Sequence, residues 1–213
     1  MTKLLFKDLT LAAHPTMYIF TLLGCLVIVP SYPMTVVFMF SCIAQYITFT
    51  YSRETNDNFF TAVLPVRKAE IVKSRYLLAV LSQTAQMVIA LPFALLRGTV
   101  EIGNNPVGID PNIAWYGAGF IIFTAFNLIF FPVYYKTGYK SGRAFITAMI
   151  PVLLLMTLTE ATAHIPALNF LDGAAPENLI RQIPVLAAGI GLYVAATLVS
   201  LRISVKRFEK VDL

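Results

Sequence analysis

Residues 113–135 read IAWYGAGFIIFTAFNLIFFPVYY, an apolar stretch that contains no charged side chain. A bilayer hydrocarbon core is about 30 Å thick and an α-helix rises about 1.5 Å per residue, so one crossing needs roughly 20 apolar residues. Asn112 precedes the stretch and Lys136 follows it, so its flanks are polar. We therefore expect residues 113–135 to form a transmembrane helix.

Five further stretches meet the same requirement. Hydrophobic residues make up 58% of the chain and charged residues only 13%, against about 25% charged residues in a typical soluble domain. No stretch alternates polar and apolar residues as a membrane β-barrel does. The sequence therefore predicts an all-α, polytopic membrane protein with one transmembrane domain over residues 1–213 and no separate nucleotide-binding domain. The six expected spans are residues 11–30, 33–51, 76–96, 113–135, 144–159 and 182–201.

The basic residues are distributed very unevenly along these spans. Lys and Arg near the end of a span resist translocation and mark the cytoplasmic side. Of the 16 Lys and Arg residues, 14 fall on the side that also holds both termini, and only Arg97 and Arg181 fall on the other. Both termini are therefore expected in the cytoplasm. The bases are spread over four juxtamembrane segments without a compact, aromatic-rich patch, so no nucleic-acid partner is expected.

The N-terminal segment, residues 1–13, has an amphipathic pattern. Leu4, Leu5 and Leu9 share one helical stripe, whereas Lys7 and Asp8 lie off it. Pro15 then ends or kinks the helix. The segment either lies as a separate short helix in the membrane interface or begins the first span, and the sequence does not decide between the two.

The connection from residue 52 to residue 75 is the longest polar segment on the cytoplasmic side. It begins with charged residues, continues with an apolar patch that includes Phe59, Phe60 and Leu64, and then reaches Pro65 and a basic run. Two short helices separated by Pro65 fit this pattern. An exposed apolar patch with a charged rim is typical of a docking site, although the two phenylalanines could instead pack under the bundle.

No Lys, Arg, Asp or Glu lies at the centre of an expected span, which argues against a charge-lined ion or proton pathway. Four amides do lie at membrane depth: Gln45, Gln83, Gln86 and Asn127. They could line a polar cavity open to the cytoplasm. They could equally hydrogen-bond to one another and hold the helices together.

The residues needed for catalysis or metal binding are scarce. The chain has two histidines, His14 and His164, which excludes a site built from several imidazoles. Glu160 and His164 are four residues apart, and we interpret them as a solvated pair in an outer loop. The run from Lys136 to Gly142 lacks the order of a phosphate-binding loop. We expect no metal, no cofactor and no ATPase activity in this chain by itself.

Residues 64–76, LPVRKAEIVKSRY, carry a resemblance to a known family. They resemble the cytoplasmic loop that joins the second and third spans of ABC-2 type permeases. The expected six spans, the cytoplasmic termini and the amphipathic start extend the resemblance over the chain. It is most similar to small six-span permeases of bacterial peptide exporters, of the phenol-soluble modulin exporter type.

The resemblance implies a half-transporter in the bacterial plasma membrane. Two copies of the permease, or one copy and a paralogue, would pair in the membrane with two copies of an ABC ATPase that binds ATP and Mg²⁺. The exported substrate would be an amphipathic or hydrophobic peptide, such as a toxin, antimicrobial or bacteriocin-like peptide. The loop would contain the coupling helix, with Phe59, Phe60 and Leu64 as its apolar contacts and Arg53, Glu54 and Asp57 at its polar rim.

Two other functions fit the same sequence. One is a membrane scaffold or immunity protein that binds a partner through residues 52–75 without transporting anything. The other is a stand-alone secondary carrier, which usually has internal repeats and broken helices at the midplane; neither is evident in the sequence.

Overall fold

The computed structural model describes residues 2–55, 57–63, 65–99, 105–137 and 140–211, and these residues form helices and no strand. The first elements are α1 (Thr2–Lys7), the π-helix η1 (Asp8–Ala12), α2 (Pro15–Leu22) and the 3₁₀-helix η2 (Leu23–Ile28). Then follow α3 (Val36–Glu54), α4 (Asp57–Val63) and α5 (Lys68–Thr99). The remaining elements are α6 (Ile113–Thr137), α7 (Ser141–Thr162), the 3₁₀-helix η3 (Pro166–Leu171) and α8 (Pro176–Phe208). The all-α prediction is confirmed.

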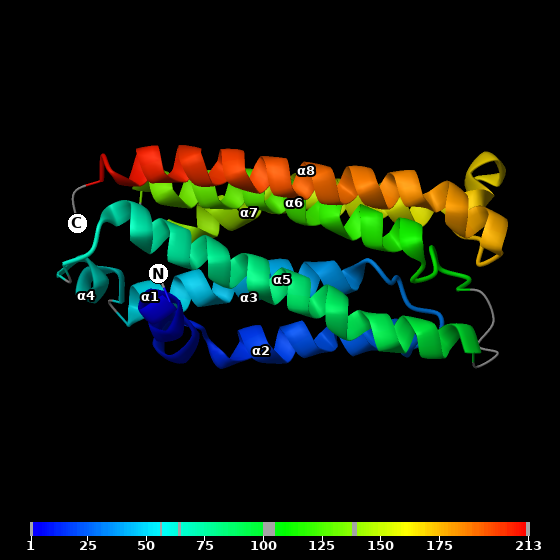
Figure 1. Ribbon diagram of the computed structural model, residues 1–213, viewed down its shortest axis with the longest axis horizontal. Coiled ribbons are helices and arrows are strands. Elements are labelled where there is room, and N and C mark those ends of the chain that lie inside the picture. The colour runs from blue at the N-terminus through cyan, green and yellow to red at the C-terminus, as the bar shows by residue number, and fades with distance from the viewer. Residues whose placement is uncertain (1, 56, 64, 100–104, 138–139, 212–213) are drawn as a thin grey trace.

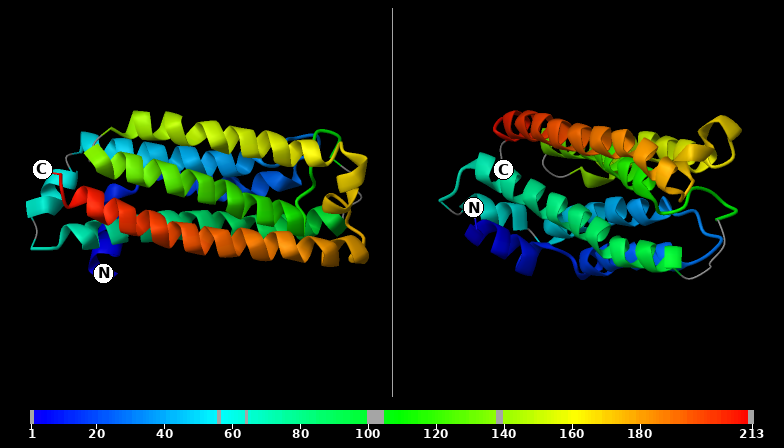
Figure 2. Two further views of the ribbon diagram at one scale, coloured as in Figure 1. Left: turned by 90° about the horizontal axis from the view of Figure 1, so that it is seen from above. Right: turned by 45° about the vertical axis from the view of Figure 1, so that its right-hand side comes forward.

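The long helices run side by side and give the molecule two ends (Figures 1 and 2). One end holds both chain ends, α1 and α4, and the other holds the turn before α6 and η3 (Figure 1). The first end is the basic one, because only Arg97 and Arg181 of the Lys and Arg residues lie at the opposite end of their helices. We call these the basic end and the distal end.

The number of crossings differs from the expected six. Four of the described helices, α5 to α8, are long and apolar enough to cross a membrane, and a bent pair, residues 3–12 with residues 15–28, raises the number to at most five. α3 is not among them, because polar and charged residues such as Gln45 and Arg53 lower the mean hydropathy of this 19-residue helix. Six crossings are therefore not confirmed.

The expected first span is broken at Ala13. The helical segment before this residue is bent by 91° from the segment after it, and the N-terminal helix projects from the bundle in Figure 2. His14 begins the new helix, because its ring nitrogen Nδ1 accepts a hydrogen bond from the backbone N–H of Thr16. Of the two alternatives for residues 1–13, the structure has the separate short helix.

The cytoplasmic connection also differs from its prediction. α4 is a short helix before Pro65, as expected, but there is no second short helix: residues from Lys68 onward belong to α5, which continues without a break to Thr99. The basic run of the loop is thus the first part of a membrane helix.

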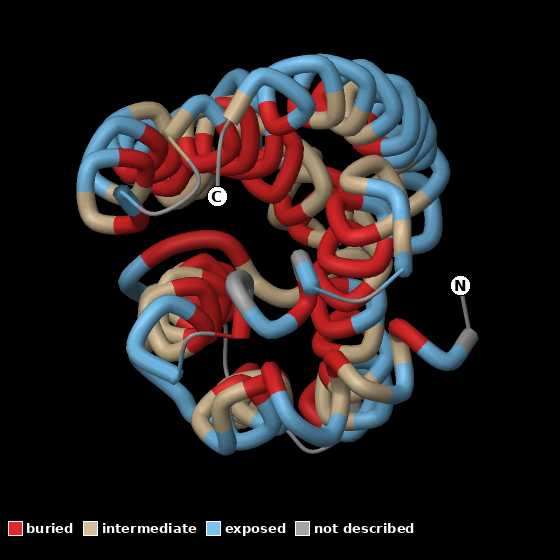
Figure 3. Tube along the Cα trace, turned by 90° about the vertical axis from the view of Figure 1, so that its left-hand side faces the viewer, coloured by how far each residue is buried: buried red, intermediate tan, exposed pale blue. Residues whose placement is uncertain are grey.

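α6 lies at the centre of the packing. Aromatic side chains on it contact those of α3: Phe38 lies 4.4 Å from Trp115 and 5.5 Å from Phe123, measured between ring centroids. On its other side α6 meets α8 at Gly117 and Gly189, where a Cβ on Gly189 would lie 2.4 Å from the carbonyl oxygen of Gly117. Small residues allow two membrane helices to approach this closely. Figure 3 shows the buried residues turned inward and the exposed ones outward.

Candidate functional site

Four charged side chains, three buried and one partly buried, form a cluster at the basic end. Lys7 and Asp8 come from the N-terminal helices, Asp57 from α4 and Arg75 from α5. Lys7 Nζ lies 2.8 Å from Asp57 Oδ1 and 3.3 Å from Asp8 Oδ1. The guanidinium of Arg75 pairs with Asp57 and lies 3.6 Å from Asp8 Oδ1. We call these four residues the ion cluster.

Hydroxyl groups add hydrogen bonds to the ion cluster. Ser74 Oγ donates to Asp8 Oδ2 at 2.5 Å, and Ser52 Oγ accepts from Arg75 at 2.9 Å. Thr61 Oγ1 accepts from Lys7 at 2.6 Å and donates to the carbonyl oxygen of Asp57 at 2.6 Å. These bonds bring together segments that are far apart in the chain, because they join the N-terminal helices, α3, α4 and α5.

The ion cluster is both buried and balanced in charge. Asp8 and Arg75 are each 3% exposed, and Asp57 is 8% exposed. Two acids face two bases, so no net charge is buried. Because a buried charge that loses its partner is strongly destabilising, each member holds the others in place. The ion cluster therefore fixes the position of α4 against α5 and the N-terminal helix.

α4 presents apolar side chains on its outer side. Phe60 is 60% exposed and Val63 is 73% exposed, although both are large hydrophobic residues. The side chain of Phe59 and all of Leu64 lie outside the described residues. Phe60 and Val63 thus form the described part of an apolar surface on a helix that the ion cluster anchors from behind.

The three residues expected to form the polar rim of the coupling helix do not share one environment in the structure. Arg53 and Glu54 are exposed at the end of α3, next to α4. Asp57 is not part of an exposed rim, because its carboxylate is a member of the buried ion cluster. Lys7, Asp8 and Arg75 were not expected at the site. The sequence carries a signal for each of them. Lys7 and Asp8 interrupt the apolar pattern of residues 4–12, and Arg75 directly precedes the apolar stretch that begins at Tyr76.

The four embedded amides bond within the bundle. Gln83 and Asn127 exchange two hydrogen bonds of 3.0 Å each, and the hydroxyl of Tyr193 on α8 donates to Gln83 Oε1 at 2.7 Å. Gln45 Nε2 donates to Ser82 Oγ at 2.6 Å. These contacts join α3, α5, α6 and α8 within the bundle, which is the arrangement expected of amides that hold helices together.

Gln86 has a special place among these amides. Its Nε2 donates to the carbonyl oxygens of Phe20 and Val37, each at 3.0 Å. Phe20 lies just before the α-helix of the first hairpin gives way to the 3₁₀-helix η2. The side chain therefore satisfies a carbonyl at an irregular part of the backbone, as membrane depth requires.

Carboxylates organise the distal end. Glu160 accepts hydrogen bonds from the backbone N–H and the hydroxyl of Thr35, at 2.8 and 2.6 Å, and from the N–H of Ile109 at 3.1 Å. The expected solvated pair between Glu160 and His164 is wrong, because the ring of His164 instead lies 3.1 Å from the carbonyl oxygen of Val107. The carboxylate of Glu160 is therefore bound by backbone N–H groups from two connecting segments, at Thr35 and at Ile109.

A second carboxylate group lies beside Glu160. Asp110 forms an ion pair of 3.0 Å with Arg97, and its backbone N–H donates to Asp172 Oδ1 at 2.7 Å. Burial raises the pKa of Asp172 above the ordinary range of an aspartate. These contacts tie the ends of α5, α6 and η3 together, and they give the distal end a structural role.

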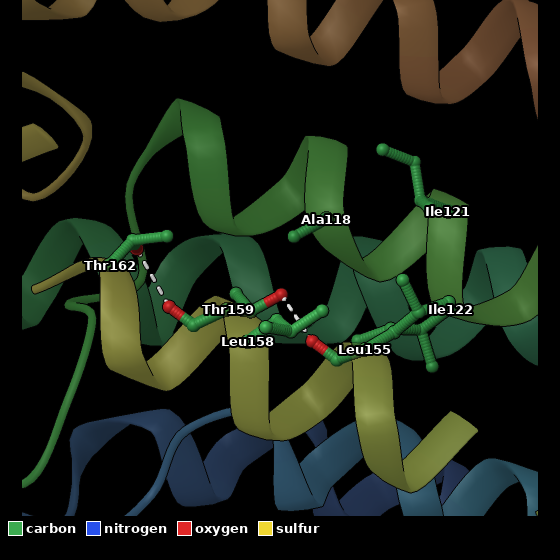
Figure 4. Close-up of a pocket in the computed structure, with 7 residues that line it drawn as sticks. All are labelled: Ala118, Ile121, Ile122, Leu155, Leu158, Thr159 and Thr162. Carbon is green, nitrogen blue, oxygen red and sulfur yellow. Dashed lines mark hydrogen bonds between the residues drawn. The ribbon is translucent and has the colours of Figure 1, made fainter. Parts of the chain in front are cut away.

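A small apolar cavity of about 160 Å³ lies between α6 and α7 (Figure 4). Thr159 and Thr162 line it, but their hydroxyls donate to carbonyl oxygens of their own helix, those of Leu155 and Thr159, at 2.8 and 2.7 Å. The cavity offers no free polar group to a ligand, and we assign it no binding role.

Long apolar helices with basic residues gathered at one end define a polytopic membrane protein. The comparison with protein families agrees. A family model described as ABC-2 family transporter protein matches residues 3–209, and the chain belongs to this family. It is thus a membrane component of a transporter. No curated protein and no solved structure matches the chain.

Proposed function

We propose that this chain is the permease subunit of an ABC exporter and that α4 is the coupling helix on which a separate ATPase docks. The observation that carries the proposal is the exposure of Phe60 and Val63 on a helix whose other side the ion cluster anchors. An exposed apolar patch with charged neighbours is typical of a protein interface. Arg53 and Glu54 would supply its polar rim, and Phe59 and Leu64 would add to its apolar part.

In this proposal the ion cluster transmits movement. α4 is connected through Asp57 and Arg75 to α5, which has 32 residues and so runs about 48 Å across the molecule. A displacement of α4 by the ATPase would therefore move a continuous helix rather than a flexible loop. ATP and Mg²⁺ would bind to the ATPase, whose closure drives the movement.

Further parts of the proposal follow from the family resemblance. Two copies of the permease, or one copy and a paralogue, would pair in the bacterial plasma membrane with both termini in the cytoplasm. The substrate would be an amphipathic or hydrophobic peptide. The basic end supports this orientation, because 14 of 16 Lys and Arg residues lie there. Substrate contact at Gln45, Gln83, Gln86 and Asn127 stays a prediction.

Co-purification tests the proposal. The tagged chain is extracted from its native membrane in mild detergent, and the recovered complex is assayed for ATPase activity. We expect a stoichiometric ATPase that is lost from the Phe60→Asp and Val63→Asp variants. Lys210→Asp is the matched control, because this exposed residue lies at the same end and its substitution changes the charge even more.

Two results would contradict the proposal. The first is recovery of the folded chain without any ATPase, which would favour a scaffold or a secondary carrier. The second is equal loss of the ATPase from the Lys210→Asp control, because α4 would then have no special part in docking. Thermal unfolding of each variant separates a docking defect from misfolding.

A further inference from the structure

An apolar groove of about 660 Å³ lies in the distal half of the molecule, between α5, α6 and α8. It exists because α5 and α8 diverge toward the distal end (Figure 1). Near the basic end the two helices touch, where the hydroxyl of Tyr76 lies 2.7 Å from the hydroxyls of Ser200 and Ser204. α5 lines the groove from Thr84 to Gly98.

We propose that this groove binds one acyl chain of a phospholipid from the outer leaflet. The proposal goes beyond the transport function and uses only the orientation assigned above. Thr84 lies near the middle of α5 and Gly98 near its distal end, so the groove runs about 21 Å along the helix. This length is comparable to the depth of one leaflet, since half of the hydrocarbon core is about 15 Å.

The width of the groove selects an extended chain over a helix. The groove together with its open side has about 1390 Å³ of empty space, which over this length corresponds to a mean cross-section of about 66 Å². A helix with its side chains is 10 to 12 Å in diameter and needs about 80 Å² or more. A helix of a second copy or a helical peptide therefore does not fit inside the groove and could only lie along its open side, whereas an extended hydrocarbon chain fits within it.

The chemistry of the groove wall agrees with this occupant. None of the described residues that line it is charged. Tyr116 lies in the first turn of α6, at the distal mouth, and within the described part of the chain its buried hydroxyl has no hydrogen-bond partner. The ester carbonyl of a lipid lies at this depth when its chain fills the groove, and it can accept a hydrogen bond from Tyr116. An uncharged mouth also predicts no selection by headgroup charge.

Photolabelling tests the proposal on the intact chain in vesicles of phosphatidylethanolamine and phosphatidylglycerol. The probe is phosphatidylethanolamine with a diazirine at the end of one acyl chain, and mass spectrometry of peptides maps the labelled residues. We expect labels near Thr84, Phe120 and Ile190, where the inner end of the groove lies. Excess unlabelled phospholipid should reduce this labelling saturably, unlike that of lipid-exposed surface.

A matched pair of double variants strengthens the test. Ala94→Phe with Gly98→Leu fills the groove, since both residues line it and no atom lies within 4 Å of a Cβ built on Gly98. Gly191→Leu with Ala195→Phe makes the same changes on an exposed face of α8, where a Cβ on Gly191 also has open space. We expect labelling of the groove to fall by about threefold or more in the first variant and to stay unchanged in the second.

Three results would overturn the proposal. One is labelling of Ile150 and Leu154, on the exposed face of α7, as strong as labelling of the groove. Another is cross-linking of the groove to a second copy of the chain in place of lipid. The third is a strong preference between the phosphatidylethanolamine probe and its phosphatidylglycerol counterpart. None of these results depends on whether the chain binds an ATPase.

Discussion

Neutralising Asp57 should destabilise the protein more than its position on a short cytoplasmic helix suggests. Asp57→Asn keeps the shape of the side chain but leaves Lys7 and Arg75 facing only Asp8. Breaking a buried ion pair by removing one partner costs about 3 kcal/mol or more. For a chain of this size, a loss of about 3 kcal/mol lowers the melting temperature by about 6 to 12 °C.

A double-mutant cycle shows whether charge balance is the cause. Adding Lys7→Gln to Asp57→Asn leaves one acid, Asp8, and one base, Arg75, which lie 3.6 Å apart. The double variant should therefore be more stable than the sum of the single effects predicts, by about 1 kcal/mol or more. The melting temperature in detergent is the measurement, and Glu54→Gln, an exposed neighbour, is the control with a change within about 0.5 kcal/mol. Additive effects of the two substitutions would refute the balanced cluster.

Three further predictions concern the bundle and the distal end. Gln83→Leu should destabilise the protein by about 0.6 to 1.7 kcal/mol in a denaturation experiment in detergent. Adding Asn127→Leu should recover part of that stability, because neither amide of the pair is then left without its partner. A second loss of stability of the same size would contradict the amide pair. Gly189→Leu should destabilise the protein by about 1 to 3 kcal/mol and so lower its melting temperature by several degrees, because the new Cβ would meet the backbone of Gly117. Gly191→Leu should have no such effect, and equal effects of the two substitutions would contradict the close contact of α6 and α8. Asp172→Asn should raise the melting temperature at pH 7. The pKa of Asp172 is raised in the folded state, so the wild-type protein loses stability as pH rises through the window between the unfolded and folded pKa values. The difference in melting temperature should close below the ordinary pKa range of aspartate, and a difference that persists there would refute this explanation.

The sequence predicts the apolar helices well and the breaks between them poorly. α6 to α8 follow from long apolar stretches, whose physical requirement depends on the local sequence alone. The break at Ala13 and the 3₁₀-helix after Leu22 depend on contacts that are remote in the chain. Gly24 packs so closely on α5 that a Cβ there would lie 2.7 Å from the carbonyl oxygen of Gln86, and the amide of Gln86 in turn bonds to Phe20.

The candidate site shows the same division. The short helix α4 could be located from an apolar patch between charged residues, since that pattern is local, whereas its part in docking stays a prediction. The role of Asp57 could not, because its partners Lys7 and Arg75 are 50 and 18 residues away. Glu160 likewise could not be separated from His164 by spacing alone, because its true donors, Thr35 and Ile109, become neighbours only after the helices pack.

α5 takes part in four of the features described. It carries Arg75 of the ion cluster, Gln83 of the amide pair, the wall of the groove and Arg97, which pairs with Asp110 at the distal end. The first part of α5 is tied to α4 through Arg75, and its last part is tied to the turn before α6 through Arg97. A shift of α5 at the basic end is therefore opposed by these contacts at the distal end. The stretch that lines the groove begins at Thr84, beyond Arg75, and extends to the distal anchor at Arg97. In the proposed mechanism a displacement of α4 would reach the wall of the groove through α5, so an acyl chain bound there would oppose any approach of α5 to α8.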